Sequence, residues 1–358
     1  MKGSERQDGL QALRLVAALL VVITHASFYT HERLSSEMPV WSPGAIGVDI
    51  FFVISGFVMM LTADGFMNRP DGWKVFAARR VLRIVPMYWL ATSIKLISLL
   101  VVPSVVLHAE LEPSKVVLSY LLLPSTNVDG RFEPLLGVGW TLIFEMFFYA
   151  VFTLALVLRT NVIAFVGSVL GVCILISAFR EPSWNAATMY FNPIVGFFFV
   201  GMVFALIKDK IDARVLLAAS VVGLAALALG NMFFGVEIAA KARSVGGFLT
   251  ASLIVLLCIG AEPLLKGRVP KWILFLGEAS YALYLFHPLI SPAVPEVLKR
   301  LGVDAPALSV ILSVAAALVG ASIIHVAIEK PVTRWLRPFV PYADGNRNRA
   351  AGIGLSKH

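Results

Sequence analysis

Long apolar stretches separated by short polar segments run along almost the whole chain. Runs of about 20 residues bounded by charges, proline or glycine are typical of helices that cross a membrane. About ten such runs are present, at residues 10–29, 44–62, 83–102, 138–158, 162–179, 190–207, 213–234, 245–262, 273–291 and 307–328. They are uninterrupted rather than alternating, which favours helices over a membrane barrel. The pattern predicts an all-α, polytopic integral membrane protein.

Composition agrees with this prediction. The 358 residues are 58% hydrophobic and 15% charged, with a mean hydropathy of +0.84, which is far more apolar than a soluble globular protein. Cys173 and Cys258 each fall inside a candidate span, so the sequence predicts neither a disulfide framework nor a thiolate-rich metal site. The formal charge of +8 follows membrane topology and does not indicate a nucleic-acid partner.

The basic residues predict the orientation of the chain. Counted with those at the span edges, 20 lysines and arginines lie at the two termini and in the loops after spans two, four, six and eight, against 8 in the other five loops. Because basic loops stay in the cytoplasm, we expect both termini there. Residues 103–137 then form an outward loop, in which 116–124 is an interfacial or re-entrant piece. We expect one membrane domain at 1–338 and a flexible, basic cytoplasmic tail at 339–358.

Two ionisable side chains interrupt the first apolar run. Arg14 and His25 are eleven residues apart, and eleven steps of about 100° leave them on the same helix face, roughly 16 Å apart along the axis. An ionisable group inside a span usually faces protein or a wet cavity and indicates function. The alternatives are that Arg14 extends to a lipid headgroup and that His25 is solvated at the interface.

Arginines gather at the cytoplasmic end of the predicted bundle. Span three begins in FAARRVLRIVP, which contributes Arg79, Arg80 and Arg83 beside Arg14. Arginine forks bind phosphates in a bidentate manner, so these four side chains are a candidate anion clamp. The alternative is that they only reflect the bias of basic residues toward the cytoplasm.

A second polar group is expected near the outer side. It combines carboxylates, imidazoles and hydroxyls from spans one, two, four and nine, namely His25, Asp49, Glu145, Ser280, Tyr281, Tyr284 and His287. Hydrogen bonds between helices account for one or two such residues. They account poorly for all of them, which favours a functional site.

Together these motifs resemble a known family. Arg14 and His25 are followed in order by GVDIFFVISGF, ARRVLRI, WTLIFEMFFY and SYALYLFHP. This series is similar to the membrane-bound acyltransferase-3 family, in particular its exopolysaccharide O-acetyltransferase branch, over residues 10 to about 335.

The resemblance implies a function and a set of roles. Family members move an acyl group, commonly acetyl, from cytoplasmic acyl-CoA to a hydroxyl of an extracytoplasmic glycan, such as exopolysaccharide or its lipid-linked precursor. The implied location is the bacterial inner membrane. His25 matches the essential histidine, Arg14 its partner, Arg80 and Arg83 the paired arginines, and Glu145 the acid of the tryptophan-to-tyrosine motif. Some members carry a further esterase-like domain after the spans. This sequence shows only the membrane domain, so we expect the transfer to take place within that domain.

The chemistry suits these groups independently of the resemblance. A sugar hydroxyl needs a base near neutral pH, and histidine is suited to that role, so we expect His25 to be the base and Glu145 or Asp49 to orient it. Trp140, Tyr284 or a backbone N–H would stabilise the oxyanion. Expected substrate contacts come from Trp140, Tyr149, Tyr284 and His287. The resemblance implies that acetyl-CoA or another acyl-CoA is the donor substrate, and neither a cofactor nor a metal is expected to stay bound. Direct transfer and a transient acyl-His25 both remain open.

A different class of protein carries similar residues. In a proton-coupled transporter or flippase, an intramembrane histidine and two carboxylates form a proton relay. Such folds often show matched broken helices in two related halves, and the sequence contains no such repeat. A transferase is therefore favoured, with membrane lipids around it, and neither its acceptor nor its oligomeric state follows from the sequence.

Overall fold

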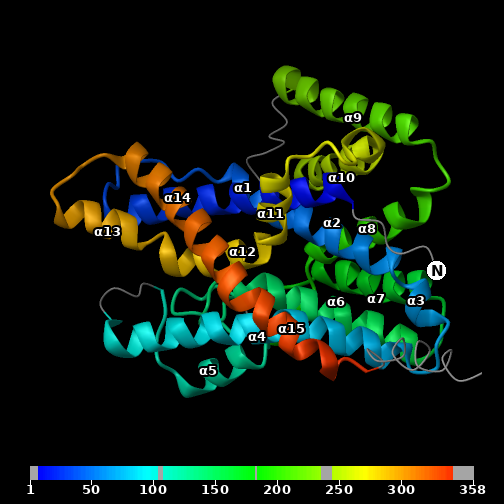
Figure 1. Cartoon of the computed structure of the whole chain (residues 1–358), viewed down its shortest axis with the longest axis horizontal. Coiled ribbons are helices and arrows are strands. Elements are labelled where there is room, and N and C mark those ends of the chain that lie inside the picture. The colour runs from blue at the N-terminus through cyan, green and yellow to red at the C-terminus, as the bar shows by residue number, and fades with distance from the viewer. Residues whose placement is uncertain (1–6, 104–107, 182–183, 235–243, 342–358) are drawn as a thin grey trace, which may run out of the picture.

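The computed structural model describes residues 7–103, 108–181, 184–234 and 244–341, and these ranges contain helices but no strand (Figure 1). The α-helices are α1 (Asp8–Arg33), α2 (Ile46–Leu61), α3 (Asp64–Met67), α4 (Gly72–Val101), α5 (Pro113–Tyr120), α6 (Gly139–Val157), α7 (Val162–Ser177), α8 (Gly196–Ile207), α9 (Ala213–Phe234), α10 (Val245–Leu265), α11 (Lys271–Glu278), α12 (Ser280–Ile290), α13 (Ala293–Arg300), α14 (Pro306–Ile324) and α15 (Lys330–Leu336). Short 3₁₀ turns are η1 (Pro43–Ala45), η3 (Ala186–Tyr190), η4 (Pro193–Val195) and η6 (Arg337–Phe339), and η5 (His325–Glu329) is a π-helical turn.

The predicted all-α membrane architecture is confirmed. Seven helices in the described residues are long and apolar enough to cross a membrane, and an eighth crossing is possible if one bent pair counts as one span. Two further predicted spans form the shorter apolar helices Val162–Ser177 and Pro193–Ile207. The apolar piece expected at 116–124 contributes to α5. The expected tail lies outside the described residues from position 342 onward.

The span predicted at 273–291 is bent and not straight. The segment divides into α11 and α12, and the helix pair that includes them is bent by 66°. Gly277 lies at the end of α11, and a Cβ atom there would lie 2.2 Å from the backbone oxygen of Gln11. This glycine lets α11 touch the backbone of α1 and also weakens the helix at that point. A hydropathy pattern cannot detect a break that a close backbone contact stabilises.

Helix α1 occupies the interior of the bundle. It packs against α2, α10, α11, α12 and α14 (Figure 1). Its first turn is held by Glu262 of α10, whose two carboxylate oxygens accept hydrogen bonds from the backbone N–H groups of Asp8 and Gly9 at 2.8 and 2.9 Å. A carboxylate at this end also complements the helix dipole. Arg14 and His25 are therefore carried by a helix whose first turn is anchored to α10.

Small residues allow α2 to contact α8 at backbone distance. A Cβ atom on Gly56 would lie 1.9 Å from the carbonyl oxygen of Phe198, and one on Gly201 would lie 2.0 Å from that of Val53. Beside this contact, the rings of Phe148 and Phe198 stack with centroids 4.5 Å apart. Close approach through small residues is a typical way for helices to associate where burial from water does not drive association.

We expect substitution of either interface glycine to destabilise the fold. Gly56→Ala and Gly201→Ala each force the two backbones apart, and overpacking of this kind costs about 1–3 kcal/mol. Gly171→Ala on α7 is the matched control, because its Cβ atom meets nothing within 4 Å. Thermal unfolding of the detergent-solubilised protein, followed by size-exclusion chromatography, measures the difference. Equal thermal stability of all three variants would contradict this packing.

Candidate functional site

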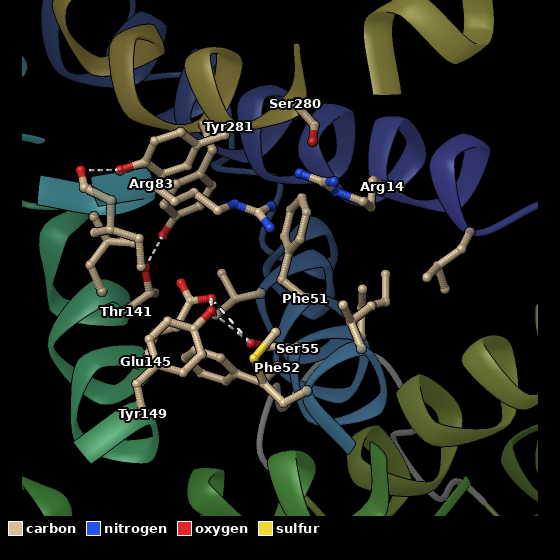
Figure 2. Close-up of a pocket in the computed structure, with 18 of the residues that line it drawn as sticks. Arg14, Phe51, Phe52, Ser55, Arg83, Thr141, Glu145, Tyr149, Ser280 and Tyr281 are labelled. Carbon is tan, nitrogen blue, oxygen red and sulfur yellow. Dashed lines mark hydrogen bonds between the residues drawn. The ribbon is translucent and has the colours of Figure 1, made fainter. Parts of the chain in front are cut away.

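One cavity lies between α1, α2, α4, α6 and α12 and contains arginine. Its volume is about 260 Å³, and its polar lining residues are Gln11, Arg14, Ser55, Arg83, Thr141, Glu145, Tyr149, Ser280, Tyr281 and Tyr284. We call it the arginine cavity. Figure 2 shows the guanidinium groups of Arg14 and Arg83 pointing toward each other across it. The two positive charges lie close enough to repel each other electrostatically.

The four predicted clamp arginines divide into two groups. Arg14 and Arg83 line the arginine cavity. Arg80 is buried, with its guanidinium carbon 5.6 Å from the ring centroid of Tyr149, which does line the cavity. Arg79 lies over the ring of Phe66, at 5.6 Å, and is not among the lining residues. The structure thus brings two of the four guanidinium groups directly to the cavity.

Glu145 belongs to the arginine cavity and not to the surroundings of His25. Its carboxylate accepts hydrogen bonds from the hydroxyls of Ser55, at 3.1 Å, and Tyr149 (Figure 2). It also attracts Arg14 electrostatically. The geometry therefore gives Glu145 the role of balancing the charge of the arginines. Ser55 is a polar contact that the sequence did not single out, because a lone serine in an apolar helix gives no signal.

A second, larger cavity contains His25. It has a volume of about 530 Å³, within the range of small-molecule sites, and shares no lining residue with the arginine cavity. Its ionisable lining residues are His25, Tyr29, Arg33, Lys95, His108, Arg131, Glu133, Glu296 and Arg300. We call it the histidine cavity. Trp140 lines it as well.

The hydrogen-bond partners of His25 define its tautomer. Its Nδ1 lies 3.1 Å from the carbonyl oxygen of Val21 and 3.2 Å from Nε2 of His287. His287 Nδ1 donates in turn to the carbonyl oxygen of Leu283 at 3.0 Å, so its Nε2 is an acceptor. Since a carbonyl only accepts, the proton of neutral His25 is on Nδ1. Nε2 of His25 then keeps its lone pair.

A thin layer of side chains separates the two cavities. Tyr284 lines the arginine cavity, and its hydroxyl lies 2.8 Å from Thr141 Oγ1 and 3.2 Å from the carbonyl oxygen of Val138, which lines the histidine cavity. The ring of His287 lies 6.0 Å from that of Tyr284 and 4.9 Å from that of His25. These three rings connect one cavity to the other through the protein interior.

The remaining predicted residues are distributed as follows. Asp49 is buried in the first turn of α2 and lines neither cavity. His287 is fully buried, so its observed contacts favour positioning of His25 over contact with substrate. Tyr149 and Tyr284 lie on the arginine side and Trp140 on the histidine side. In the described residues, no group of three or more histidine, cysteine, aspartate or glutamate side chains forms a candidate metal site.

Comparison with known proteins identifies similar sequences. Residues 7–326 match the acyltransferase-3 family, described as an acyltransferase domain. "Exopolysaccharide production protein ExoZ" of Rhizobium meliloti (strain 1021) is 34% identical over 330 residues, which cover 86% of this chain and 94% of that protein.

Two other relatives are longer than this chain. "O-acetyltransferase OatA" of Staphylococcus aureus (strain NCTC 8325 / PS 47) is 27% identical over 79% of this chain and 50% of its own length. "Putative peptidoglycan O-acetyltransferase YrhL" of Bacillus subtilis (strain 168) is 25% identical over 92% of this chain and 56% of its own length. The chain thus spans about half of these two proteins. No solved structure is significantly similar to the chain.

We predict that His287 holds the tautomer of His25. His287→Leu removes one of the two acceptors for His25 Nδ1–H. The ratio of the Nε2–H tautomer to the Nδ1–H tautomer should therefore rise about tenfold, as expected for losing a buried hydrogen bond. His287→Gln retains an acceptor oxygen and should preserve the Nδ1–H form. Nitrogen-15 NMR of the imidazoles in detergent measures this, with His25→Gln to assign the signal. An Nε2–H form in the unmodified protein would contradict the geometry.

Proposed function

Because this chain belongs to the acyltransferase-3 family, we propose that it transfers an acetyl group from acetyl-CoA to a hydroxyl of an extracytoplasmic glycan. The proposed acceptor is an exopolysaccharide or its lipid-linked precursor. The names of the similar proteins support this class, since they concern exopolysaccharide production and O-acetyl transfer. Other acyl-CoA donors satisfy the same chemistry.

One observation carries the proposal. Two separate cavities meet α1, the first containing Arg14 and the second containing His25. Eleven residues of helix separate these side chains by roughly 16 Å, a distance that an extended pantetheine arm can cover. A donor can thus bind with its phosphates at one cavity and its thioester close to the other. The coenzyme itself does not need to cross the membrane.

Arginines would hold the anionic end of the donor. Arg14 and Arg83 face the same space, and guanidinium forks match phosphate oxygens. Glu145 lies beside them and reduces their mutual repulsion while the donor is absent. The hydroxyls of Tyr149 and Ser55 hold this carboxylate in place. Glu145 is therefore proposed as a positioning residue for donor binding.

His25 would act as the base in the histidine cavity. Its Nε2 accepts the proton of the acceptor hydroxyl while the oxygen attacks the thioester carbonyl, and the charge on the imidazolium is shared with His287 through Nδ1. When the carbon–sulfur bond breaks, the proton passes from His25 to the leaving thiolate. The products are free coenzyme A and the O-acetyl ester. Trp140 lines the same cavity and is the candidate donor to the oxyanion.

Charge distribution supports a particular orientation of this reaction. With both termini in the cytoplasm, as the split of 20 to 8 basic residues predicts, the arginine cavity faces the cytoplasmic pool of acyl-CoA. The histidine cavity then faces outward, where surface glycans are assembled. The proposed location is the bacterial inner membrane, because the similar proteins are bacterial.

Isotope transfer tests the proposed reaction. Membranes from a strain lacking the protein, supplied with the unmodified protein and labelled acetyl-CoA, should release coenzyme A and transfer label to their surface glycan as base-labile ester. His25→Ala should lower the rate by about 10²–10⁴-fold, the contribution of a general base, without loss of folded protein. A proton-coupled transporter would instead leave acetyl-CoA intact. That result would refute the transferase.

We predict that Arg83→Lys weakens donor binding although the charge is kept. An ammonium group cannot reproduce the bidentate fork, so the KM for acetyl-CoA should rise about tenfold, equivalent to one lost charged hydrogen bond. Arg69→Lys, an exposed position before α4, is the matched control and should leave the KM unchanged. Equal KM values for both variants would show that Arg83 contributes only to membrane topology and not to donor binding.

A further inference from the structure

The histidine cavity carries more positive than negative charge. Of its described lining residues, four are lysine or arginine and two are glutamate. Glu133, in the loop before α6, is one of the two, and burial raises the pKa of its carboxyl group. A neutral sugar does not require such a surplus. The cavity therefore has the electrostatics of a site for an anion.

Lys95 is a cation of the histidine cavity that lies inside a membrane span. It lies within the membrane-spanning helix α4 and lines the histidine cavity. Its ammonium group makes no hydrogen bond or ion pair with the part of the chain that the structure describes. A charged lysine inside a membrane span is costly unless it pairs with another group or faces a wet cavity. A cation that lacks such a pair and lines a cavity indicates a ligand that compensates its charge.

A second cation stands next to Lys95. Arg33, at the end of α1, lines the same cavity and lies close enough to repel Lys95 electrostatically. The nearby carboxylate of Glu296 is shared, because it accepts hydrogen bonds from Arg300 at 2.9 Å and lies 3.9 Å from Arg33. One carboxylate thus serves two guanidinium groups and does not offset Lys95. Like charges converge here around a space large enough for a ligand.

We infer that the histidine cavity binds an acceptor glycan through a negatively charged group, a carboxylate or a phosphate, held by Lys95 and Arg33. This inference rests on the proposed function and narrows its acceptor to anionic glycans. Uronic acids and carboxylate-bearing sugar substituents supply the charge within a polysaccharide. The diphosphate of a lipid-linked oligosaccharide supplies it in a precursor.

Helix geometry locates the charge relative to the reacting hydroxyl. His25, Tyr29 and Arg33 are spaced by four residues on α1, so they follow one face, and eight residues separate His25 from Arg33 by about 12 Å. That distance exceeds the width of one sugar ring. The charged group therefore belongs to a neighbouring unit of the acceptor and not to the sugar that receives the acetyl group. Tyr29 lies between the two ends and lines the cavity.

Neutralised acceptors test the inference directly. Glycan and lipid-linked precursor are isolated from a strain lacking the protein, and each is offered intact, with its carboxylates reduced to alcohols, or with its diphosphate removed. With the unmodified protein and labelled acetyl-CoA, removing the recognised group should raise the acceptor KM about tenfold. If the KM rises when the carboxylates are reduced, the recognised group is an acid of the polysaccharide. If the KM rises when the diphosphate is removed, the recognised group belongs to the lipid-linked precursor.

Variants connect this charge dependence to the cavity. Lys95→Met should raise the KM for the intact acceptor about tenfold, leave the KM for acetyl-CoA unchanged, and abolish the preference for the charged over the neutralised acceptor. Lys299→Met is the matched control, since Lys299 is exposed on α13 and does not line the cavity. Its kinetics should match those of the unmodified protein.

Three outcomes overturn the inference while the proposed function stands. The first is that the unmodified protein uses charged and neutralised acceptors equally well. The second is that Lys95→Met lowers the acetylation of charged and neutralised acceptors to the same extent. The third is a rise in the KM for acetyl-CoA in Lys95→Met, which would assign the cations to the donor. If the unmodified protein transfers no label to any acceptor, the proposed function fails instead.

Discussion

Charge buried in an apolar helix has to face a partner or a wet cavity, and this constraint organises the protein. Helix α1 carries Arg14 and His25 on one face, and the bundle supplies a separate polar cavity for each. The carboxylate of Glu262 holds the first turn of α1 in place, and close backbone contacts fix its neighbours, as at Gly47 against Ala17. The two cavities therefore lie at a defined separation along one helix.

The sequence predicts the architecture better than the connections within the site. Hydropathy identifies every long apolar helix, because burial in lipid acts on composition alone. It also indicates that Arg14 and His25 are special, since both violate that composition. The bend between α11 and α12 depends on a backbone contact at Gly277, which no single-chain pattern records.

Depth estimated from the start of a helix was a poor guide to side-chain partners. The sequence predicts Glu145 near His25, but the carboxylate lies with Arg14 and Arg83 in the arginine cavity. His287 does meet His25, but as a buried neighbour rather than at a surface for substrate. Lys95 is a charge within a predicted span, but it lies outside the motifs of the sequence, so the sequence assigns it neither a partner nor a role. Tertiary packing, which the sequence does not encode locally, decides these pairings.

The hydrogen bond between Tyr284 and Thr141 has a consequence for the cell's energy balance. In the proposed orientation, the two polar cavities approach each other from opposite sides of the membrane and thin its insulating layer, and each charge that leaks through a membrane loses about 2.3 kcal/mol per 100 mV. The layer formed by Tyr284, Thr141 and His287 separates the cavities. In that orientation, the layer would act as a seal against proton and ion leakage while no ligand is bound. Any opening of this layer has to be filled by the ligand that opens it, so that the passage never conducts while it is empty.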